Sequence, residues 1–288
     1  MTAVLVDDLD TYGVVGDPVE HSLSPKIHQA FAAQFAQEIS YRKFHVTAAD
    51  FADFVHAFAA AGGKGLNVTV PHKGSAYALV NRCNEFAERA RAVNTISINS
   101  NGEMLGCNTD GVGLVRDIIS RHGELLAGKA ILLLGAGGAA QGVVAPLLAQ
   151  QPARLTIANR TLEKAREVLR LNSDAAGASE TSAMGFDELP QAPGCAADVI
   201  INATSMGLAG TRVPLPGGAA EGAFCYDMSY GAAALFAAWA QDNGARSSVD
   251  GLGMLVEQAA ESYSIWRGTL PETEPVLQML RAQLAAGL

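Results

Sequence analysis

The sequence predicts an α/β fold with two domains, and three observations point to it. Residues 12–70 alternate strand and helix in a β-α-β-α-β order, which is typical of a parallel sheet with helices on its faces. An apolar strand over residues 129–134 runs directly into a glycine-rich turn and a helix. The chain has 288 residues, which is enough for two domains of ordinary size.

Composition limits the classes of protein to consider. Hydrophobic residues make up 49% of the chain and charged residues 17%, so it can bury a large core. The net charge of -9 argues against nucleic acid or an anionic membrane as the main partner. No apolar run reaches the roughly 18 residues of a membrane span, and the acidic N-terminus, a short tail over residues 1–10, is no secretory signal. Cys83, Cys107, Cys195 and Cys225 lack C-x-x-C spacing, so we expect free thiols, no metal and a cytoplasmic protein.

The elements of the first half follow from hydrophobic periodicity and turn residues. Ser24 is expected to cap a helix that has Pro25 at its first position, and Asp50 to cap the next helix. Asn101-Gly102 is a strong hairpin signal. The expected strands are 12–16, 41–46, 65–70, 92–98 and 104–108, and the expected helices begin near 24, 50, 75 (in two pieces to 91) and 109.

In the second half, the segment 172–197 is rich in Ala, Ser, Gly and Pro and predicts only one short strand, near 183–186. The remaining expected strands are 129–134, 154–158, 198–202 and 223–227. One helix is expected directly after the glycine-rich turn and another from about 161 to 171, and further helices are expected at 235–242, 251–266 and 274–286.

A polar strand end carries the first candidate for chemistry. Asn67 and Thr69 share one face of a strand that Pro71 ends, and Lys73 follows the stop. Open α/β sheets bind ligands at such carboxyl ends, so Lys73 is a candidate catalytic cation. Asp110 also follows a polar strand end, and the two charges can share a site if the ends are neighbours. The plainer alternatives are a surface lysine and a helix-capping aspartate.

The glycine-rich turn predicts a dinucleotide site. Gly135 permits a tight turn, Gly137 lets the backbone approach a pyrophosphate, and Ala140 allows close packing of helix and strand. The next strand ends without an acidic residue for a ribose hydroxyl; Arg160 and Lys164 stand there instead and favour NADP over NAD. The alternatives are a simple tight turn and a solvated helix start.

A series of motifs runs in order over nearly the whole chain: Gly16-x-Pro18-x-x-His21-Ser22-x-Ser24-Pro25, Asn67-Val-Thr69-x-Pro-x-Lys73, Ala92-Val-Asn94-Thr95, Gly106-x-Asn108-Thr-Asp110, Gly135-Ala-Gly-Gly-Ala139, Asn159-Arg160-Thr161, Asn202-Ala-Thr-Ser205 and Asp250-Gly-Leu-Gly-Met-Leu-Val-x-Gln258-Ala. In these motifs and their order the chain resembles the shikimate dehydrogenases, most of all the biosynthetic NADP-dependent type. Two positions depart from the family pattern: Gln29 follows His28 where many members have Asn, and Lys164 often appears as Arg.

The resemblance implies that NADPH reversibly reduces 3-dehydroshikimate to shikimate in aromatic amino acid biosynthesis. It implies that Lys73 is the acid/base residue and Asp110 its partner. Asn67 shares the face of Thr69 and would touch substrate or orient Lys73. The implied substrate-binding residues are Ser22, Ser24, Asn67, Thr69, Asn94, Asp110, Tyr230 and Gln258.

The same resemblance implies the cofactor site and the domains. A substrate domain over 1–109 and 251–288 has a mostly parallel sheet, and a Rossmann-like, doubly wound NADP-binding domain covers 110–250, so the C-terminal helices return to the first domain. An NAD-dependent quinate/shikimate dehydrogenase and a non-catalytic ligand sensor stay open as alternatives, as do a monomer and a homodimer. The implied cofactor-binding residues are Glu85, Gly135, Ala136, Gly137, Gly138, Ala139, Asn159, Arg160, Thr161, Lys164, Met228 and Gly251.

Overall fold

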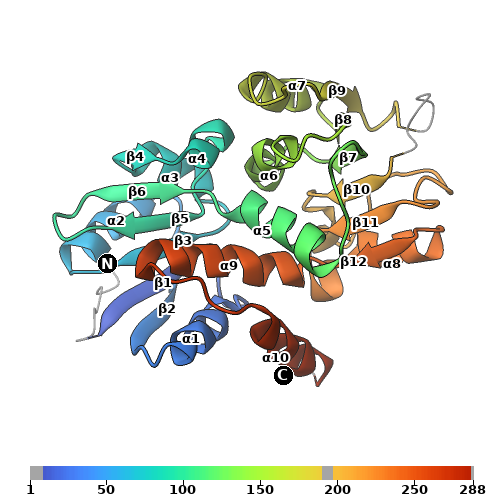
Figure 1. The fold of residues 1–288 in the computed structure, drawn as a ribbon. Helices are drawn as coiled ribbons and strands as arrows, with labels where there is room; N and C mark the ends of the chain where they lie inside the picture. The colour runs from blue at the N-terminus through green and yellow to red at the C-terminus, as the bar shows by residue number, and fades with distance from the viewer. Residues whose placement is uncertain (1–8, 190–196, 287–288) are drawn as a thin grey trace. The chain divides into compact units, whose positions relative to one another are not determined.

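The computed structural model describes residues 9–189 and 197–286, and the chain divides into two compact units (Figure 1). The first unit runs to Thr109 and resumes at Val256, and the second covers Asp110–Leu255. The second boundary therefore falls inside helix α9 (Leu252–Arg267), whereas the sequence placed it before that helix. The predicted tail up to residue 8 and Cys195 lie outside the described residues.

The first unit contains a mixed sheet with the strand order β2-β1-β3-β5-β6-β4. As predicted, β1 pairs in parallel with β2 and β3, whereas β5 runs antiparallel to both β3 and β6. Gly102 forms the predicted turn between β5 and β6 with a φ of 80°. The strands are β1 (Asp10–Gly16), β2 (Ile39–His45), β3 (Gly65–Val68), β4 (Arg82–Cys83), β5 (Thr95–Ile98) and β6 (Met104–Cys107).

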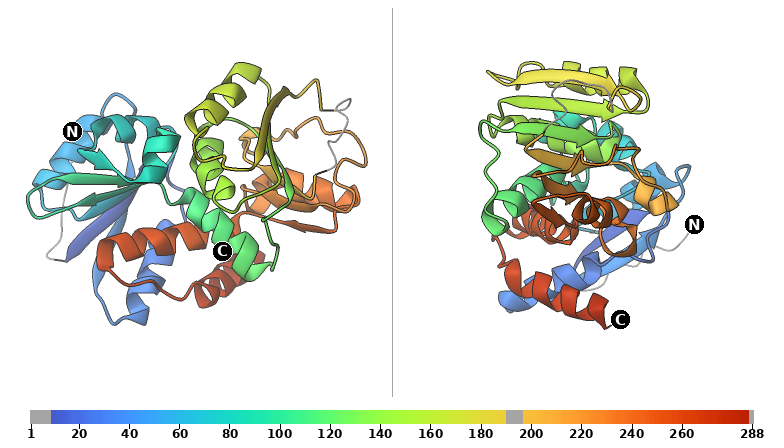
Figure 2. Two further views of the ribbon diagram at one scale, coloured as in Figure 1. Left: turned by 45° about the horizontal axis from the view of Figure 1, so that its top comes forward. Right: turned by 90° about the vertical axis from the view of Figure 1, so that its right-hand side faces the viewer.

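Helices cover both faces of this sheet (Figure 2). On one face, Phe51 and Phe58 of α2 pack in one cluster with Val68 of β3. On the other face, Trp266 of α9 packs against Tyr12 of β1, with the ring centroids 4.8 Å apart. The helices of this unit are α1 (Ser24–Gln34), α2 (Phe51–Ala60), α3 (Lys73–Leu79), α4 (Glu85–Ala90), α9 from Val256 onward and α10 (Glu274–Ala285).

The second unit contains an all-parallel sheet with the strand order β12-β11-β10-β7-β8-β9. The chain starts in the middle at β7, adds two strands on one side and then three on the other, which is the doubly wound order. The predicted α/β class with a Rossmann-like unit is confirmed. The strands are β7 (Ala130–Leu134), β8 (Arg154–Asn159), β9 (Glu180–Gly185), β10 (Val199–Asn202), β11 (Phe224–Asp227) and β12 (Ser247–Val249).

The apolar run in β7 is explained by burial on both faces. Ile131 and Leu133 belong to one buried cluster, and Leu132 and Leu134 to a second cluster with Phe236 of α8. Alternate residues of a strand point to opposite faces, so a strand covered on both sides needs an unbroken apolar sequence. The helices of this unit are α5 (Asp110–Arg116), α6 (Gly138–Leu148), α7 (Leu162–Leu171) and α8 (Leu235–Asp242).

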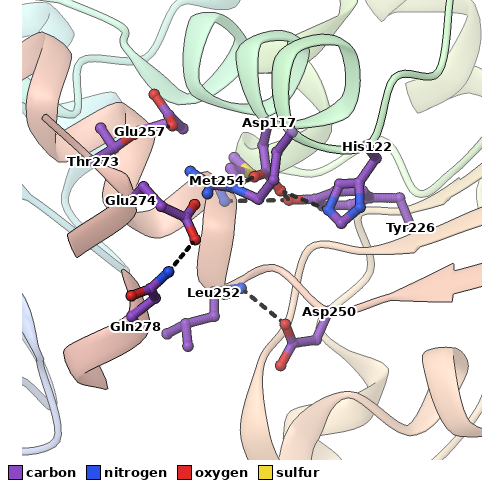
Figure 3. Close-up of polar contacts among 11 residues, drawn as sticks. Asp117, His122, Tyr226, Asp250, Leu252, Met254, Glu257, Thr273, Glu274 and Gln278 are labelled. Carbon is purple, nitrogen blue, oxygen red and sulfur yellow. Dashed lines mark hydrogen bonds and ion pairs between the residues drawn. The ribbon is translucent and has the colours of Figure 1, made fainter. Parts of the chain in front are cut away.

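A buried polar cluster holds the first turn of α9 within the second unit (Figure 3). Asp117 opens a π-helical turn after α5, and its carboxylate accepts hydrogen bonds from Tyr226 at 2.6 Å and from Arg121 at 2.7 Å. The Tyr226 hydroxyl in turn accepts the backbone N–H of Met254 at 3.2 Å. Burial raises the pKa of Asp117, but hydrogen bonds from His122, Tyr226 and Arg121 outweigh it and hold the pKa below its ordinary value. These contacts explain why the compact second unit includes the start of α9.

Several predicted details were wrong. Ser24 is the first residue of α1 and makes no capping hydrogen bond, because its hydroxyl faces that of Ser22 at 3.1 Å. Asp50 stands at the N-cap of α2, but its carboxylate accepts a hydrogen bond from the Thr47 hydroxyl at 2.6 Å and caps no backbone group. Strand β3 ends at Val68, and β4 and β12 were not predicted.

Within the described parts of the chain, no helix has the length and apolar character needed to cross a membrane.

Candidate active site

The loop after β3 places Lys73 at the first residue of α3. Val70 and Pro71 are joined by a cis peptide bond, and the Val70 carbonyl accepts the N–H of Asp17 at 3.0 Å. The buried ring of His72 stacks on Phe51, with the centroids 4.7 Å apart, and its Nε2 lies 2.7 Å from the carbonyl oxygen of Val46. The half-buried Lys73 thus directly follows His72, whose ring is held by the stacking on Phe51 and by the contact with the Val46 carbonyl.

Asp110 is buried at the first residue of α5, where the second unit begins. Lys73 belongs to the first unit, so the sharing of one site by Lys73 and Asp110 stays a prediction. The helix start provides positive potential that favours a carboxylate at this position. Asp110 is the first helical residue and stands one position after the N-cap, and its catalytic role stays a prediction.

Asn94 is held between two strands. Its N–H donates to the Cys107 carbonyl at 3.0 Å, and its own carbonyl accepts the N–H of Val68 at 2.8 Å. Its side-chain Oδ1 accepts the backbone N–H of Thr109 at 2.9 Å, and its Nδ2 lies 3.3 Å from Oε1 of Gln258. The structure therefore brings together Asn94 and Gln258, two predicted substrate residues that are far apart in the sequence.

Asn67 joins a chain of buried polar side chains. Its Oδ1 accepts the Tyr41 hydroxyl at 2.7 Å, and its Nδ2 donates to the hydroxyls of Ser262 at 3.0 Å and Thr95 at 3.3 Å. Burial raises the pKa of Tyr41 well above its usual value, against a smaller opposing hydrogen bond from Ser24, so the phenol stays protonated as a donor. No charged side chain takes part in these contacts.

Ser22 and Ser24 meet in the loop that leads into α1. The Ser22 hydroxyl donates to that of Ser24 at 3.1 Å and accepts the Ser24 N–H at 3.2 Å. Thr69 is half-buried beside Gly16, where a Cβ on the glycine would lie 2.4 Å from the Thr69 Cγ2. Gly16 therefore has to be glycine for Thr69 to hold this position.

The glycine-rich turn of the second unit has the backbone geometry that the sequence predicted. Gly135 has a φ of 107°, and a Cβ there would also lie 3.1 Å from the Ala203 carbonyl oxygen that follows β10. Gly137 is the N-cap of α6, and a Cβ built on Gly137 or Gly138 would meet nothing within 4 Å. This open space at a helix N-terminus fits the approach of a phosphate group to backbone N–H donors. Ala136 is buried, and Ala139 is half-buried.

The end of β8 presents exposed cations. Asn159 donates from Nδ2 to the carbonyl of Thr161 at 2.8 Å, and Thr161 is the N-cap of α7. Arg160 and Lys164 are exposed on either side of that cap. Glu85, in the first unit, is exposed at the start of α4, where its carboxylate lies 3.1 Å from Arg89.

The loop after β11 is shaped by a buried carboxylate. Asp227 accepts hydrogen bonds from Asn202 and from the N–H groups of Ser229 and Phe236, each at 3.0 Å. Gly251 donates its N–H to the Ser229 carbonyl at 2.8 Å, and a Cβ on Gly251 would lie only 2.4 Å from the carbonyl oxygen of Met228. Met228 and Gly251 are therefore neighbours.

Tyr230, which follows the same strand, is half-buried in the second unit. Burial raises the pKa of its phenol. The hydroxyl therefore remains a hydrogen-bond donor at neutral pH.

Two buried residues that contact Asn67 and Asn94 in the first unit were not predicted as site residues. Thr95 and Ser262 are both fully buried, with hydroxyl oxygens 2.7 Å apart. Ser262 stands four residues after Gln258, and residues with this spacing share one helix face, so the i, i+4 pattern was the signal that could have found it. Thr95 follows Asn94 directly, and its inward direction could not be read before the strand register was known.

The fold and the glycine-rich turn define a class of protein, the two-unit α/β proteins with a doubly wound unit of the dinucleotide-binding type. Three family models match the chain: the shikimate dehydrogenase substrate binding domain at residues 14–96, shikimate / quinate 5-dehydrogenase at 117–209, and the shikimate 5′-dehydrogenase C-terminal domain at 251–281. A protein named shikimate dehydrogenase (NADP(+)) from Alkalilimnicola ehrlichii is 50% identical over 276 residues, covering 95% of this chain and 99% of that protein. The chain belongs to the shikimate dehydrogenase family.

Solved structures share the fold over most of the chain. The crystal structure of an Ael1 enzyme from Pseudomonas putida has a TM-score of 0.85 at 39% identity and covers 94% of this chain and 98% of its own. A shikimate 5-dehydrogenase from Thermus thermophilus, crystallised in complex with NADP(H) and shikimate, has a TM-score of 0.78 at 26% identity with coverages of 94% and 98%.

Proposed function

We propose that this protein is an NADP-dependent shikimate dehydrogenase that reversibly reduces 3-dehydroshikimate to shikimate. The observation that carries the proposal is the neutral cluster of amides and hydroxyls around Asn94 and Gln258, in the same unit as Lys73. Such groups can bind a polyhydroxylated acid through its hydroxyls without adding net charge. Relatives named shikimate dehydrogenase (NADP(+)) support the assignment.

Lys73 is proposed as the acid/base residue. NADPH, when bound, supplies the hydride that adds to the ketone carbon. Negative charge then develops on the ketone oxygen, where the Lys73 ammonium stabilises it and delivers a proton. In the reverse direction the Lys73 amine takes the proton from the hydroxyl. Asp110 is proposed to hold the ammonium in place through its carboxylate.

The remaining substrate contacts divide by chemistry. Ser22 and Ser24 offer hydroxyl donors that suit the substrate carboxylate, and Tyr230 is proposed beside them. The amides of Asn94 and Gln258 suit ring hydroxyls, because an amide offers both a donor and an acceptor. Asn67, Thr69 and Asp110 complete the proposed substrate set.

The cofactor residues fit NADP by their surroundings. The open space at Gly137 and Gly138 leaves room for a pyrophosphate next to the start of α6, where Gly135, Ala136 and Ala139 shape the turn. The exposed side chains of Arg160 and Lys164, together with Asn159 and Thr161, suit a 2′-phosphate. Strand β8 ends in Asn159, so its last residue offers no carboxylate for a ribose 2′-hydroxyl. Met228 and Gly251 are proposed to line the nicotinamide side, and Glu85 is proposed as a further contact.

An absorbance assay at the NADPH band tests the proposal. Purified protein with shikimate and NADP should form NADPH, with kcat/KM higher for NADP than for NAD and higher for shikimate than for quinate. A preference for NAD and quinate would replace the proposal with a quinate/shikimate dehydrogenase. Absence of turnover from folded protein would leave a ligand sensor as the better reading. We also propose that the enzyme is cytoplasmic. We propose that it is a monomer or a homodimer, and sedimentation of the pure protein would decide between these two states.

A further inference from the structure

Two buried hydroxyls lie behind the amides of the proposed substrate site. Thr95 comes from β5 and Ser262 from α9, their side chains are fully buried, and their oxygens are 2.7 Å apart. Both are too deeply buried to touch a ligand directly. Their contacts nevertheless lead to Asn67, Asn94 and Gln258, three of the residues proposed to bind substrate.

The direction of each hydrogen bond fixes the orientation of Asn94. A backbone N–H can only donate, so the Asn94 atom 2.9 Å from the N–H of Thr109 has to be the oxygen. The Thr95 hydroxyl donates to this same oxygen at 2.9 Å. The other atom of the Asn94 amide is therefore the NH₂ group, which donates to the Thr109 hydroxyl at 2.9 Å and to Oε1 of Gln258 at 3.3 Å.

The orientation of Gln258 follows from that of Asn94. Because Oε1 accepts from Asn94, the NH₂ group of the half-buried Gln258 lies on the other side of its amide. Because the Thr95 proton goes to Asn94, the single proton of Ser262 goes to Thr95 at 2.7 Å, and the Ser262 oxygen lies 3.0 Å from the carbonyl oxygen of Gln258, one helix turn earlier. Ser262 also accepts from Nδ2 of Asn67 at 3.0 Å.

We propose that the buried hydroxyls of Thr95 and Ser262 are positioning groups for substrate recognition, which hold the Asn67, Asn94 and Gln258 amides in one donor and acceptor arrangement. This inference rests on the proposed function. A substrate with ring hydroxyls then meets donors and acceptors in fixed places. Without the hydroxyls, an amide can turn over, and a buried group that loses its partner costs binding free energy.

Paired substitutions at Thr95 separate the hydroxyl from the packing. Thr95→Val keeps the shape and removes the oxygen, whereas Thr95→Ser keeps the oxygen and removes a methyl group. We expect Thr95→Val to raise KM for shikimate roughly tenfold, the usual effect of one lost hydrogen bond, with kcat and KM for NADP changed by less than about twofold. Thr95→Ser should keep KM for shikimate near that of the wild-type protein.

Ser262→Ala provides a second variant that removes a single atom from a helix. We expect KM for shikimate to rise about threefold to tenfold, and the double variant with Thr95→Val to add little, because both hydroxyls act through one chain. Thermal unfolding of every variant is measured alongside, and a raised KM in a variant with the wild-type melting temperature supports the proposal.

Four results would overturn the inference. A normal KM in Thr95→Val together with a raised KM in Thr95→Ser would assign the effect to packing. Equal losses in kcat and in KM for both ligands would assign it to general damage to the fold. Unchanged kinetics in all variants, with an active wild-type protein, would overturn the positioning role and leave the proposed function intact. A wild-type protein that is inactive toward shikimate would overturn both.

Discussion

The two proposed binding regions use different parts of the chain. In the first unit, the region around Asn94 and Gln258 is built from buried amide and hydroxyl side chains that hold one another. In the second unit, the region around Gly137 and Arg160 offers backbone at a helix start and exposed cations. The difference teaches that the hydroxyls of a polyhydroxylated acid require side chains in fixed orientations, whereas a phosphate can be bound by helix dipoles and exposed charges.

Lys73 is the charged exception in the first region, and its removal should have the largest effect. Lys73→Ala should lower kcat for shikimate oxidation by about 10²–10⁴, the usual contribution of general acid–base catalysis. Steady-state kinetics with saturating NADP measures this. The matched control is Lys64→Ala, at an exposed lysine of the same unit, which should keep wild-type kinetics. An effect on KM alone would show that Lys73 only binds.

Arg160 tests the exposed cations of the second region. Arg160→Ala should lower kcat/KM for NADP by about tenfold to a hundredfold, because a charge-assisted hydrogen bond to a phosphate is lost, and should change kcat/KM for NAD little. Higher salt should reduce the difference between variant and wild-type protein, since exposed charges are screened. Arg166→Ala, at an exposed arginine of α7, is the control. An equal loss with both cofactors would remove Arg160 from the 2′-phosphate site.

His28 tests how strongly the interior of the first unit excludes charge, with an effect of about tenfold in the unfolding equilibrium per pH unit. Burial lowers the pKa of His28 to about 3 from an ordinary 6.5. Below pH 6.5 the unfolded chain binds a proton that the folded chain excludes. The stabilising contribution is therefore complete above pH 6.5 and is lost between pH 6.5 and about 3.

Urea unfolding of His28→Phe measures this contribution. Between pH 6.5 and about 3, the wild-type protein should lose about 1.4 kcal/mol more unfolding free energy per pH unit of acidification than His28→Phe. His56→Gln, at an exposed histidine of α2, should retain the wild-type slope. Parallel slopes for wild-type protein and His28→Phe would show that the imidazole gains a proton in the folded chain.

Local patterns predicted most of the fold. The strand-helix alternation of residues 12–70, the apolar strand β7 and the glycine turn depend on neighbouring residues, so they could be read from the sequence. The contact between Thr95 and Ser262 joins positions 167 residues apart and depends on strand register. The missed cap at Ser24 has the same cause, because the choice between capping and a bond to Ser22 is made by the folded loop.

The part of α9 in the first unit sets the direction in which the proposed substrate residue Gln258 points. Ser262 lies 2.7 Å from Thr95 of β5, and Gln258 stands one turn earlier on the same helix. Each residue of an α-helix advances the chain by about 100° around the axis. Inserting one residue between Gln258 and Ser262 would therefore swing the glutamine away from Asn94 while every residue type stayed the same. The number of residues along this helix therefore matters as much as their identity, because it fixes the direction of each side chain.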